Sequence, residues 1–179
     1  MLTLENSLLL VIDIQGTLAQ KMHDKPFFLG NLKKMIKGAH ILNVPLLITE
    51  QIPQKLGPTL PDIAALFSGF QPIPKVSFSC CGEPEFMKKF NAIGRTQILL
   101  TGIEAHVCVY QTAIALKSLE YEVHLLTDCI SSRTAENKLT AIERMKTEGI
   151  KLTTSEMVLF ELVKIAEGDN FREMVKVVK

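Results

Sequence analysis

Residues 97–118, QILLTGIEAHVCVYQTAIALKS, carry the clearest fold signal in this chain. Residues 98–101 are mostly apolar and predict a strand that ends at Gly102, and an amphipathic helix is predicted to begin near Cys108. A cysteine at a strand-to-helix step lies at the carboxyl edge of a parallel sheet, where open α/β folds bind ligands. The unpaired N–H groups and the dipole of a helix N-terminus also favour a thiolate. This stretch therefore predicts an α/β sheet with a candidate nucleophile at Cys108.

The same alternation of strand and helix recurs on both sides of this stretch. Residues 8–12 (LLLVI) form a continuous apolar run, typical of a buried parallel strand, and Asp13 follows at its carboxyl end. Further strands are predicted over residues 44–50, 73–78, 122–127 and 150–153, and further helices over 27–42, 83–91, 134–148, 155–166 and 170–178. Residues 51–71 contain three prolines and are predicted to form a long irregular loop. Six alternations without a break in composition predict a single domain over residues 1–179.

Composition excludes several classes of protein. The chain has 179 residues, 47% of them hydrophobic, and a net charge of +1 without a basic block, which argues against a nucleic-acid partner. Its N-terminal apolar run is too short to cross a membrane and lacks the basic leader of a signal peptide. The four cysteines show no zinc-ligand spacing. These features predict a soluble cytoplasmic protein with free thiols and no cofactor.

Three side chains could carry chemistry, and each also has a plainer interpretation. Cys108 could be a reactive thiol or a small core residue. Asp13 could accept a proton from that thiol or could cap the turn that follows its strand. Lys75 could stabilise a thiolate and a developing oxyanion, or it could be an exposed lysine on an edge strand.

The remaining candidates favour structural roles. Cys80 and Cys81 are predicted to lie on a loop and Cys129 after a strand. His106 is only two residues from Cys108, but its ring need not face the thiol, and contact with solvent or a ligand is the preferred interpretation. The four histidines show no metal-ligand spacing.

The three motifs in this order resemble the isochorismatase-like cysteine hydrolase superfamily. They are LLLVIDIQGTL with Asp13, PIPKVSFS with Lys75, and LLTGIEAHVCVYQTAIAL with Cys108, and the resemblance spans residues 8–157. The segments TEQIPQKLGPT and LLTDCISSR also resemble the branch called isochorismatase domain-containing proteins.

The resemblance implies a catalytic triad of Asp13, Lys75 and Cys108. Family members hydrolyse amides and related C–N bonds through a covalent intermediate on the cysteine. Asp13 would accept the thiol proton, Cys108 would attack the carbonyl carbon, and Lys75 would stabilise the charged states. The resemblance also implies a non-proline cis peptide at residues 103–104, and an oxyanion hole formed by the backbone N–H groups of Glu104 and Cys108.

One departure from the family pattern limits the expected chemistry. Nicotinamidases of this superfamily hold a metal with an Asp-x-His set after the second strand, whereas residues 50–53 here read EQIP. Neither a bound metal nor nicotinamide as substrate is therefore expected. The wall of the substrate pocket is expected to come from Gln15, Leu18, Gln51, Leu56, Glu104 and His106.

The resulting prediction is a three-layer α/β/α hydrolase with a six-stranded, mostly parallel sheet in the order 3-2-1-4-5-6. It would act without a metal on a small amide, ureido or related compound through an acyl-Cys108 intermediate. The resemblance further implies a homo-oligomer, a dimer or a tetramer, and the apolar segment MVLFELV is a candidate interface. The alternatives are a catalytically silent protein that binds a small molecule or a partner, and a redox-responsive thiol protein that uses Cys108 with Cys80 or Cys81.

Overall fold

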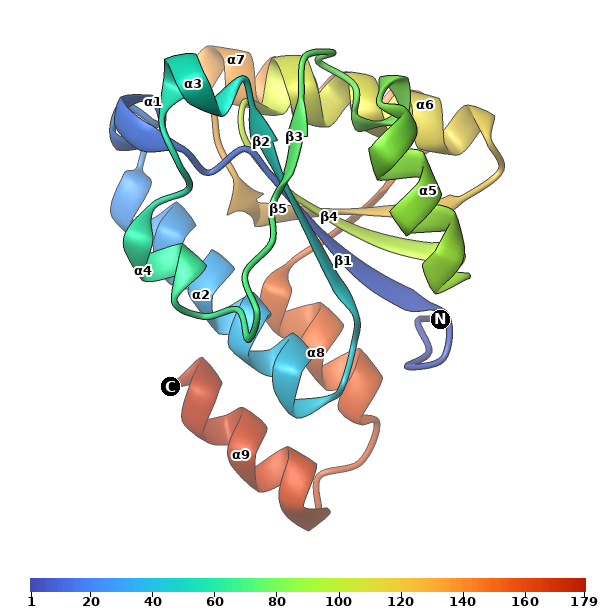
Figure 1. Cartoon of the computed structure of the whole chain (residues 1–179). Coiled ribbons are helices and arrows are strands. Elements are labelled where there is room, and N and C mark those ends of the chain that lie inside the picture. Colours follow the sequence, from blue (N-terminus) through green and yellow to red (C-terminus); the bar gives the residue numbers. More distant parts are fainter.

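A computed structural model describes residues 1–179 and contains one six-stranded sheet with helices on both faces (Figure 1). The strand order is β3-β2-β1-β4-β5-β6, as the sequence predicted, and every pair of neighbouring strands is parallel. The strands are β1 (Ser7–Ile12), β2 (Leu46–Gln51), β3 (Ile73–Lys75), β4 (Gln97–Gly102), β5 (Glu122–Ile130) and β6 (Lys151–Thr153).

The central strand β1 shows why the sheet must be covered on both faces. All six of its residues are buried, so its side chains enter two separate cores. Leu9 and Val11 pack with helices on one face, whereas Leu8, Leu10 and Ile12 pack with helices on the other. Two apolar layers therefore hold β1 and its carboxyl end in a fixed position.

The helices divide between the two faces of the sheet. Those whose buried residues join the core of Leu9 and Val11 are α2 (Lys25–Ile41), α8 (Ser155–Val163) and α9 (Gly168–Val178). The other core is formed with α5 (Pro84–Ile93), α6 (Tyr110–Ser118) and α7 (Ala135–Thr147). The predicted three-layer architecture is thus confirmed. No helix combines the length and the apolar character that a membrane crossing requires.

The connections differ from the predictions in four places. The segment 51–71 is not wholly irregular, because it contains the short helices α3 (Pro53–Leu56) and α4 (Pro61–Ala64). Each of them begins with proline, whose fixed φ suits the first helical position. Strand β3 ends at Lys75 rather than at residue 78, and an additional helix, α1 (Gly16–Gln20), follows β1.

The fourth difference concerns the pivotal helix, which begins before Cys108. A π-helical turn, Ala105–Val109, precedes α6, so Cys108 is the fourth residue of the helical segment and not its first. The segment MVLFELV also differs from the expected interface, because Val158, Leu159 and Leu162 are buried in the core. The carboxyl ends of the strands meet at the edge of the sheet where α1 and α3 lie (Figure 1).

Candidate active site

Asp13 lies immediately after β1, where the chain leaves the sheet. Its φ of 54° is in the left-handed region, which aspartate adopts more readily than most residues. One carboxylate oxygen, Oδ1, accepts a hydrogen bond from Thr49 Oγ1 at 2.8 Å, and Oδ2 lies 2.7 Å from Lys75 Nζ. Asp13 caps no helix, so the plainer interpretation of this residue does not hold. Burial raises the pKa of the carboxyl group, against the opposing effects of Lys75 and Thr49.

Lys75 ends β3 and is buried, with 2% of its surface exposed, so it is not the exposed edge lysine of the alternative interpretation. Its ammonium group pairs with Asp13 and donates to Gln51 Oε1, to Ser77 O at 3.2 Å and to Phe78 O at 3.1 Å. Burial alone would lower the pKa of Lys75, but the Asp13 carboxylate together with the ionisable thiols of Cys108 and Cys80 outweighs it, and the net direction is upward. Lys75 is therefore a buried cation that is paired with a buried carboxylate.

Cys108 is buried beside this ion pair. Its Sγ lies 3.9 Å from Gln51 Oε1, and Asp13 and Lys75 are close enough to act on its ionisation. Burial and the negative charge of Asp13 raise the thiol pKa to about 12, and the opposing effect of Lys75 is smaller. The expectation that a helix start would favour the thiolate is therefore wrong. Cys108 lies inside the helical segment and faces a carboxylate, so the resting site holds a neutral thiol.

Two glutamines join the ends of β1 and β2. The side-chain amide of Gln15 behaves like a neighbouring peptide group, because its Oε1 accepts from Gln51 N at 2.6 Å and its Nε2 donates to Gln51 O at 3.2 Å. The same Nε2 also donates to Gly57 O at 2.7 Å. In turn, Gln51 Nε2 donates to Val76 O at 2.7 Å, which directs Gln51 Oε1 toward Lys75 and Cys108.

A cavity of about 260 Å³ opens at Asp13 and Cys108, while Lys75 does not line it and reaches the site through its ion pair with Asp13. Leu18, Gln51, Leu56 and Glu104, all expected at the pocket, line it together with Asp13 and Cys108. Gln15 and His106 do not line it, because Gln15 is fully buried beneath the loop and His106 Nδ1 lies 3.0 Å from Ser132 Oγ. The sequence did not single out the other wall residues, which are Phe78, Ile103, Val107 and Arg133.

Glu104, which lines the cavity, also has an unpaired backbone donor. The Ile103–Glu104 peptide bond is cis, and the backbone N–H of Glu104 donates to no acceptor in the protein. The neighbouring carbonyl of Glu104, in contrast, accepts from Val107 N and Val109 N in the π-helical turn. The Glu104 carboxylate is held by Arg133, whose Nε lies 3.1 Å from both oxygens and whose backbone N lies 3.0 Å from Oε2.

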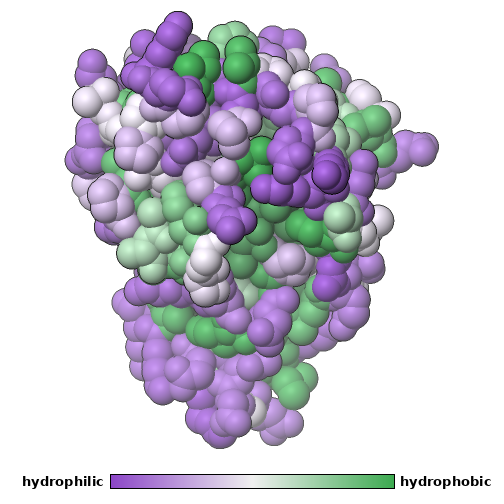
Figure 2. Space-filling view, in the orientation of Figure 1, coloured by the Kyte–Doolittle hydropathy of each residue, from purple (hydrophilic) through white to green (hydrophobic).

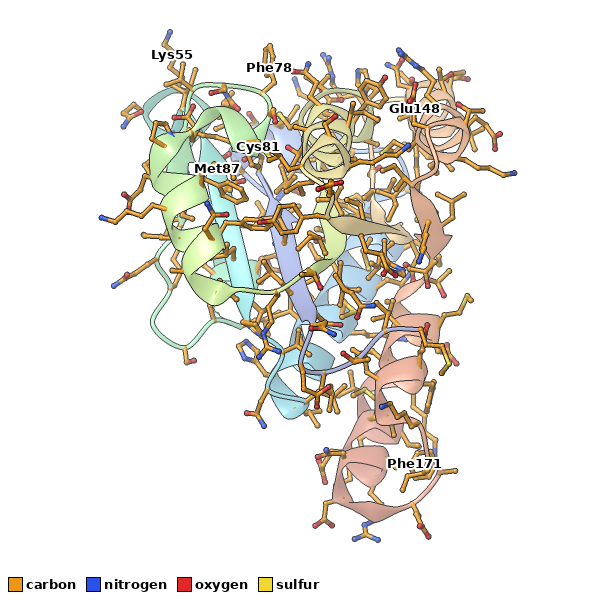
Figure 3. The ribbon with its side chains drawn as sticks, turned by 90° about the vertical axis from the view of Figure 1, so that its right-hand side faces the viewer. Lys55, Phe78, Cys81, Met87, Glu148 and Phe171 are labelled. Carbon is orange, nitrogen blue, oxygen red and sulfur yellow. The ribbon has the colours of Figure 1, made fainter.

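Two of the other thiols, Cys80 and Cys81, and Glu50, which stands where nicotinamidases carry their metal ligands, lie in structural surroundings. Cys80 is fully buried, and burial raises its pKa to about 12. Cys81 is half-buried on the turn that precedes α5, where Figure 3 labels it. Glu50, at the position of the absent metal set, accepts from Thr59 N and Thr59 Oγ1, both at 2.7 Å. No group of three or more His, Cys, Asp or Glu side chains is arranged to hold a metal ion.

Three comparisons place this geometry among known proteins. The isochorismatase domain family matches residues 7–157. Isochorismatase domain-containing protein 2A of Mus musculus is 35% identical over 176 residues, which cover 98% of this chain and 84% of the mouse protein. The structure of MAR1 ribonuclease from Caenorhabditis elegans is 33% identical with a TM-score of 0.91, covering 99% of this chain and 91% of that one.

A more distant structure has the same fold. The YcaC gene product of Escherichia coli, described as an octameric hydrolase of unknown specificity, has a TM-score of 0.92 at 22% identity and covers 98% of this chain and 89% of its own. The family match over residues 7–157 and the identity to the mouse protein together show that this chain belongs to the isochorismatase-like hydrolase superfamily.

Proposed function

We propose that this protein is a metal-independent cysteine hydrolase that cleaves a C–N bond of a small amide, ureido or related compound through an acyl-Cys108 intermediate. One observation carries the proposal. The Cys108 thiol and the Asp13 carboxylate line one cavity together with Glu104, whose backbone N–H has no protein acceptor, and the Lys75 ammonium is paired with Asp13 behind the cavity wall. A nucleophile, a base and an oxyanion donor within one cavity are the parts that acyl transfer requires.

The proposed reaction begins with attack of Cys108 Sγ on the substrate carbonyl carbon while the thiol proton moves to Asp13. The oxygen becomes an oxyanion that accepts from the N–H groups of Glu104 and Cys108. Asp13 then gives its proton to the departing nitrogen, the C–N bond breaks, and the amine leaves. Water attacks the resulting thioester as its proton passes to Asp13, and release of the acid returns that proton to the thiol.

The pKa directions suit this sequence of steps. A thiol with a pKa near 12 does not ionise ahead of substrate binding, so deprotonation has to accompany attack. A carboxyl group whose pKa is raised by burial is a stronger base than an exposed aspartate. Lys75, kept cationic by Asp13, would balance the negative charge that moves between the carboxylate, the sulfur and the oxyanion. The neutral resting thiol thus fits general-base catalysis better than a preformed thiolate.

The decisive experiment is to trap the acyl-enzyme. The protein would be incubated with a library of small amides and ureido compounds, quenched in acid, and examined by peptide mass spectrometry. We expect an acyl mass on the Cys108 peptide together with release of ammonia or an amine, and both should be lost in Cys108→Ala. Cys81→Ala is the matched control, because that thiol lies outside the cavity and should leave the signal unchanged.

The same experiment separates the alternative functions. A compound that binds and protects Cys108 from alkylation without ever acylating it would favour the catalytically silent binding protein. Because the C. elegans relative is named a ribonuclease, RNA would be tested as a substrate in the same assay. RNA cleavage that Cys108→Ala abolishes, without any amide turnover, would overturn the C–N hydrolase proposal.

A further inference from the structure

The cavity wall contains one cation with unused hydrogen-bond donors. Most of the wall is apolar, including Leu18, Leu56 and Phe78, and its only basic side chain is that of Arg133. The Arg133 guanidinium uses Nε on Glu104, while neither terminal amino group donates to a protein acceptor. Since a guanidinium carries five N–H donors, four remain available on Arg133.

Glu104 fixes where those donors lie. Its carboxylate is almost fully buried and both of its oxygens accept from Arg133, which anchors the arginine at Nε and at its backbone N–H. An arginine held at Nε keeps its planar fork of terminal N–H groups in a fixed place, and such a fork matches the two oxygens of a carboxylate. Arg133 is therefore pre-oriented, although 57% of its side chain remains exposed to solvent.

The other charged groups in the cavity wall, and Lys75 behind it, already have partners within the protein. The Lys75 ammonium has four protein acceptors and no donor to spare. The carboxylates of Asp13 and Glu104 each face a cation, so neither is free to receive a substrate ammonium group. A substrate that brings one negative charge would find an unfilled partner in this cavity, whereas a substrate that brings a positive charge would not.

We propose that Arg133 binds a carboxylate of the substrate, so that the compound cleaved at Cys108 is a small amide or ureido acid rather than a neutral amide. This assignment rests on the proposed function, because it places the carboxylate at one end of the cavity and the scissile carbonyl at Cys108. The cavity of about 260 Å³ suits a compound with few atoms beyond these two groups. Arg133 would set specificity by fixing the acid end of the substrate.

A pair of alkylating reagents tests the assignment without knowledge of the substrate. N-iodoacetylglycine and N-iodoacetylglycinamide have the same reactive carbon and differ only in the carboxylate. The rate of Cys108 alkylation by each would be followed by peptide mass spectrometry at pH 9, and the acid-to-amide rate ratio would be divided by the ratio for free N-acetylcysteine. We expect the corrected ratio in the native protein to exceed one by roughly tenfold, the size of a charge-assisted hydrogen bond.

Two substitutions complete the test. Arg133→Gln should bring the corrected ratio close to one, and Arg133→Lys, which keeps the charge but loses the fork, should give an intermediate ratio. Arg172→Gln is the matched control, because Arg172 pairs with Asp169 on α9. In Figure 3 that helix, marked by Phe171, lies at the far end of the molecule from Phe78 of the cavity wall. Thermal melting would confirm that each variant is folded.

The outcomes distinguish the two proposals. A corrected ratio near one in the native protein, or a raised ratio that survives in both Arg133 variants, would overturn the carboxylate assignment and leave the nucleophile in place. Failure of both reagents to alkylate Cys108, while Cys81 is labelled in the same samples, would count against the proposed function and against the assignment together.

Discussion

The protonation of Cys108 is set by two neighbouring charges of opposite sign, of which Asp13 has the larger effect. Replacing Asp13 by Asn removes the charge that raises the thiol pKa and leaves Lys75, whose charge lowers it. Alkylation by iodoacetamide follows the thiolate fraction. In the native protein the labelling rate of Cys108 should therefore climb about tenfold per pH unit from pH 7 to pH 10 without a plateau, because its pKa is about 12.

In Asp13→Asn, iodoacetamide should label Cys108 faster than in the native protein at pH 8, and the labelling rate should level off at a lower pH than in the native protein. Amide turnover should be lost, because the substitution also removes the general base. Mapping the alkylated peptides over this pH range measures both effects, and Cys81 in the same samples serves as the internal standard. Equal labelling of Cys108 in the two proteins at every pH would show that Asp13 does not act on the thiol.

Lys75 is a buried cation paired with a buried carboxylate, so we expect it to support stability as well as the proposed chemistry. Lys75→Met leaves Asp13 charged and without its cation, and breaking a buried pair in this way costs roughly 3–5 kcal/mol. Urea unfolding should show that loss. The double variant Asp13→Asn/Lys75→Met removes both charges and should be more stable than Lys75→Met alone. A double variant that is less stable than the single one would contradict this account.

The sequence singled out Asp13 at the end of a strand, Lys75 within a short apolar strand and Cys108 at a strand-to-helix step, and the family resemblance joined them into one candidate triad. It did not identify the contacts that arise only when distant segments meet. Thr49, which donates to Asp13, and Arg133, which holds Glu104, carry no local signal of either role. The direction of the Cys108 pKa shift was also misjudged, because it depends on burial and on Asp13, 95 residues away in the sequence, and not on the helix start alone.

At the scale of elements, the pattern of apolar residues was sufficient to predict the strands of the sheet but not the segments that connect them. The continuous apolar runs of β1 and β4 correctly predicted central strands that are buried throughout. The end of β3 was misplaced because residues 76–78 continue an apolar pattern, although Val76 and Phe78 are exposed. The π-helical turn at Ala105–Val109 has no distinctive composition and depends on tertiary contacts.

Gly102 shows how one element constrains its neighbour. It ends β4 with a φ of 123°, and a Cβ at this position would lie 2.2 Å from Ile12 O and 2.6 Å from Ile12 N on β1. Gly102→Ala would force apart the two central strands just below the site, and we expect a loss of roughly 2–3 kcal/mol in the free energy of unfolding. Denaturant titration measures this change.

Gly30→Ala is the matched control for Gly102→Ala. Gly30 lies in the exposed middle of α2, where an added Cβ would meet no atom within 4 Å. Since alanine loses less backbone entropy in a helix, the control should gain about 0.5–1 kcal/mol. If Gly102→Ala were as stable as the native protein, the close approach of β1 and β4 would not be the reason for this glycine.

At the scale of the whole molecule, one of the two apolar cores lies apart from the candidate site. The core formed with α2, α8 and α9 lies on one face of the sheet, and the site lies at the carboxyl edge near α1 and α3 (Figure 1). Figure 2 shows apolar atoms exposed at the top of the molecule and across its middle, between hydrophilic areas. Among the exposed apolar side chains, Val76 and Phe78 are close in sequence, with 73% and 54% of their surface exposed, and Phe78 also lines the cavity.

Exposed apolar side chains that lie next to one another often belong to interaction surfaces. We therefore predict that Val76 and Phe78, at the rim of the cavity, contribute to a homo-oligomer interface. Light scattering of the purified protein at micromolar concentration should give at least twice the chain mass of 19.9 kDa. Val76→Ser/Phe78→Ser should weaken the assembly, whereas Leu139→Ser, which alters an equally exposed apolar residue on α7, should not. A monomer in the native protein would refute the prediction, and dissociation only by Leu139→Ser would move the interface to α7. Because Phe78 belongs to both surfaces, dissociation by the double variant should also change the alkylation rate of Cys108, so assembly and access to the site would be coupled through one side chain.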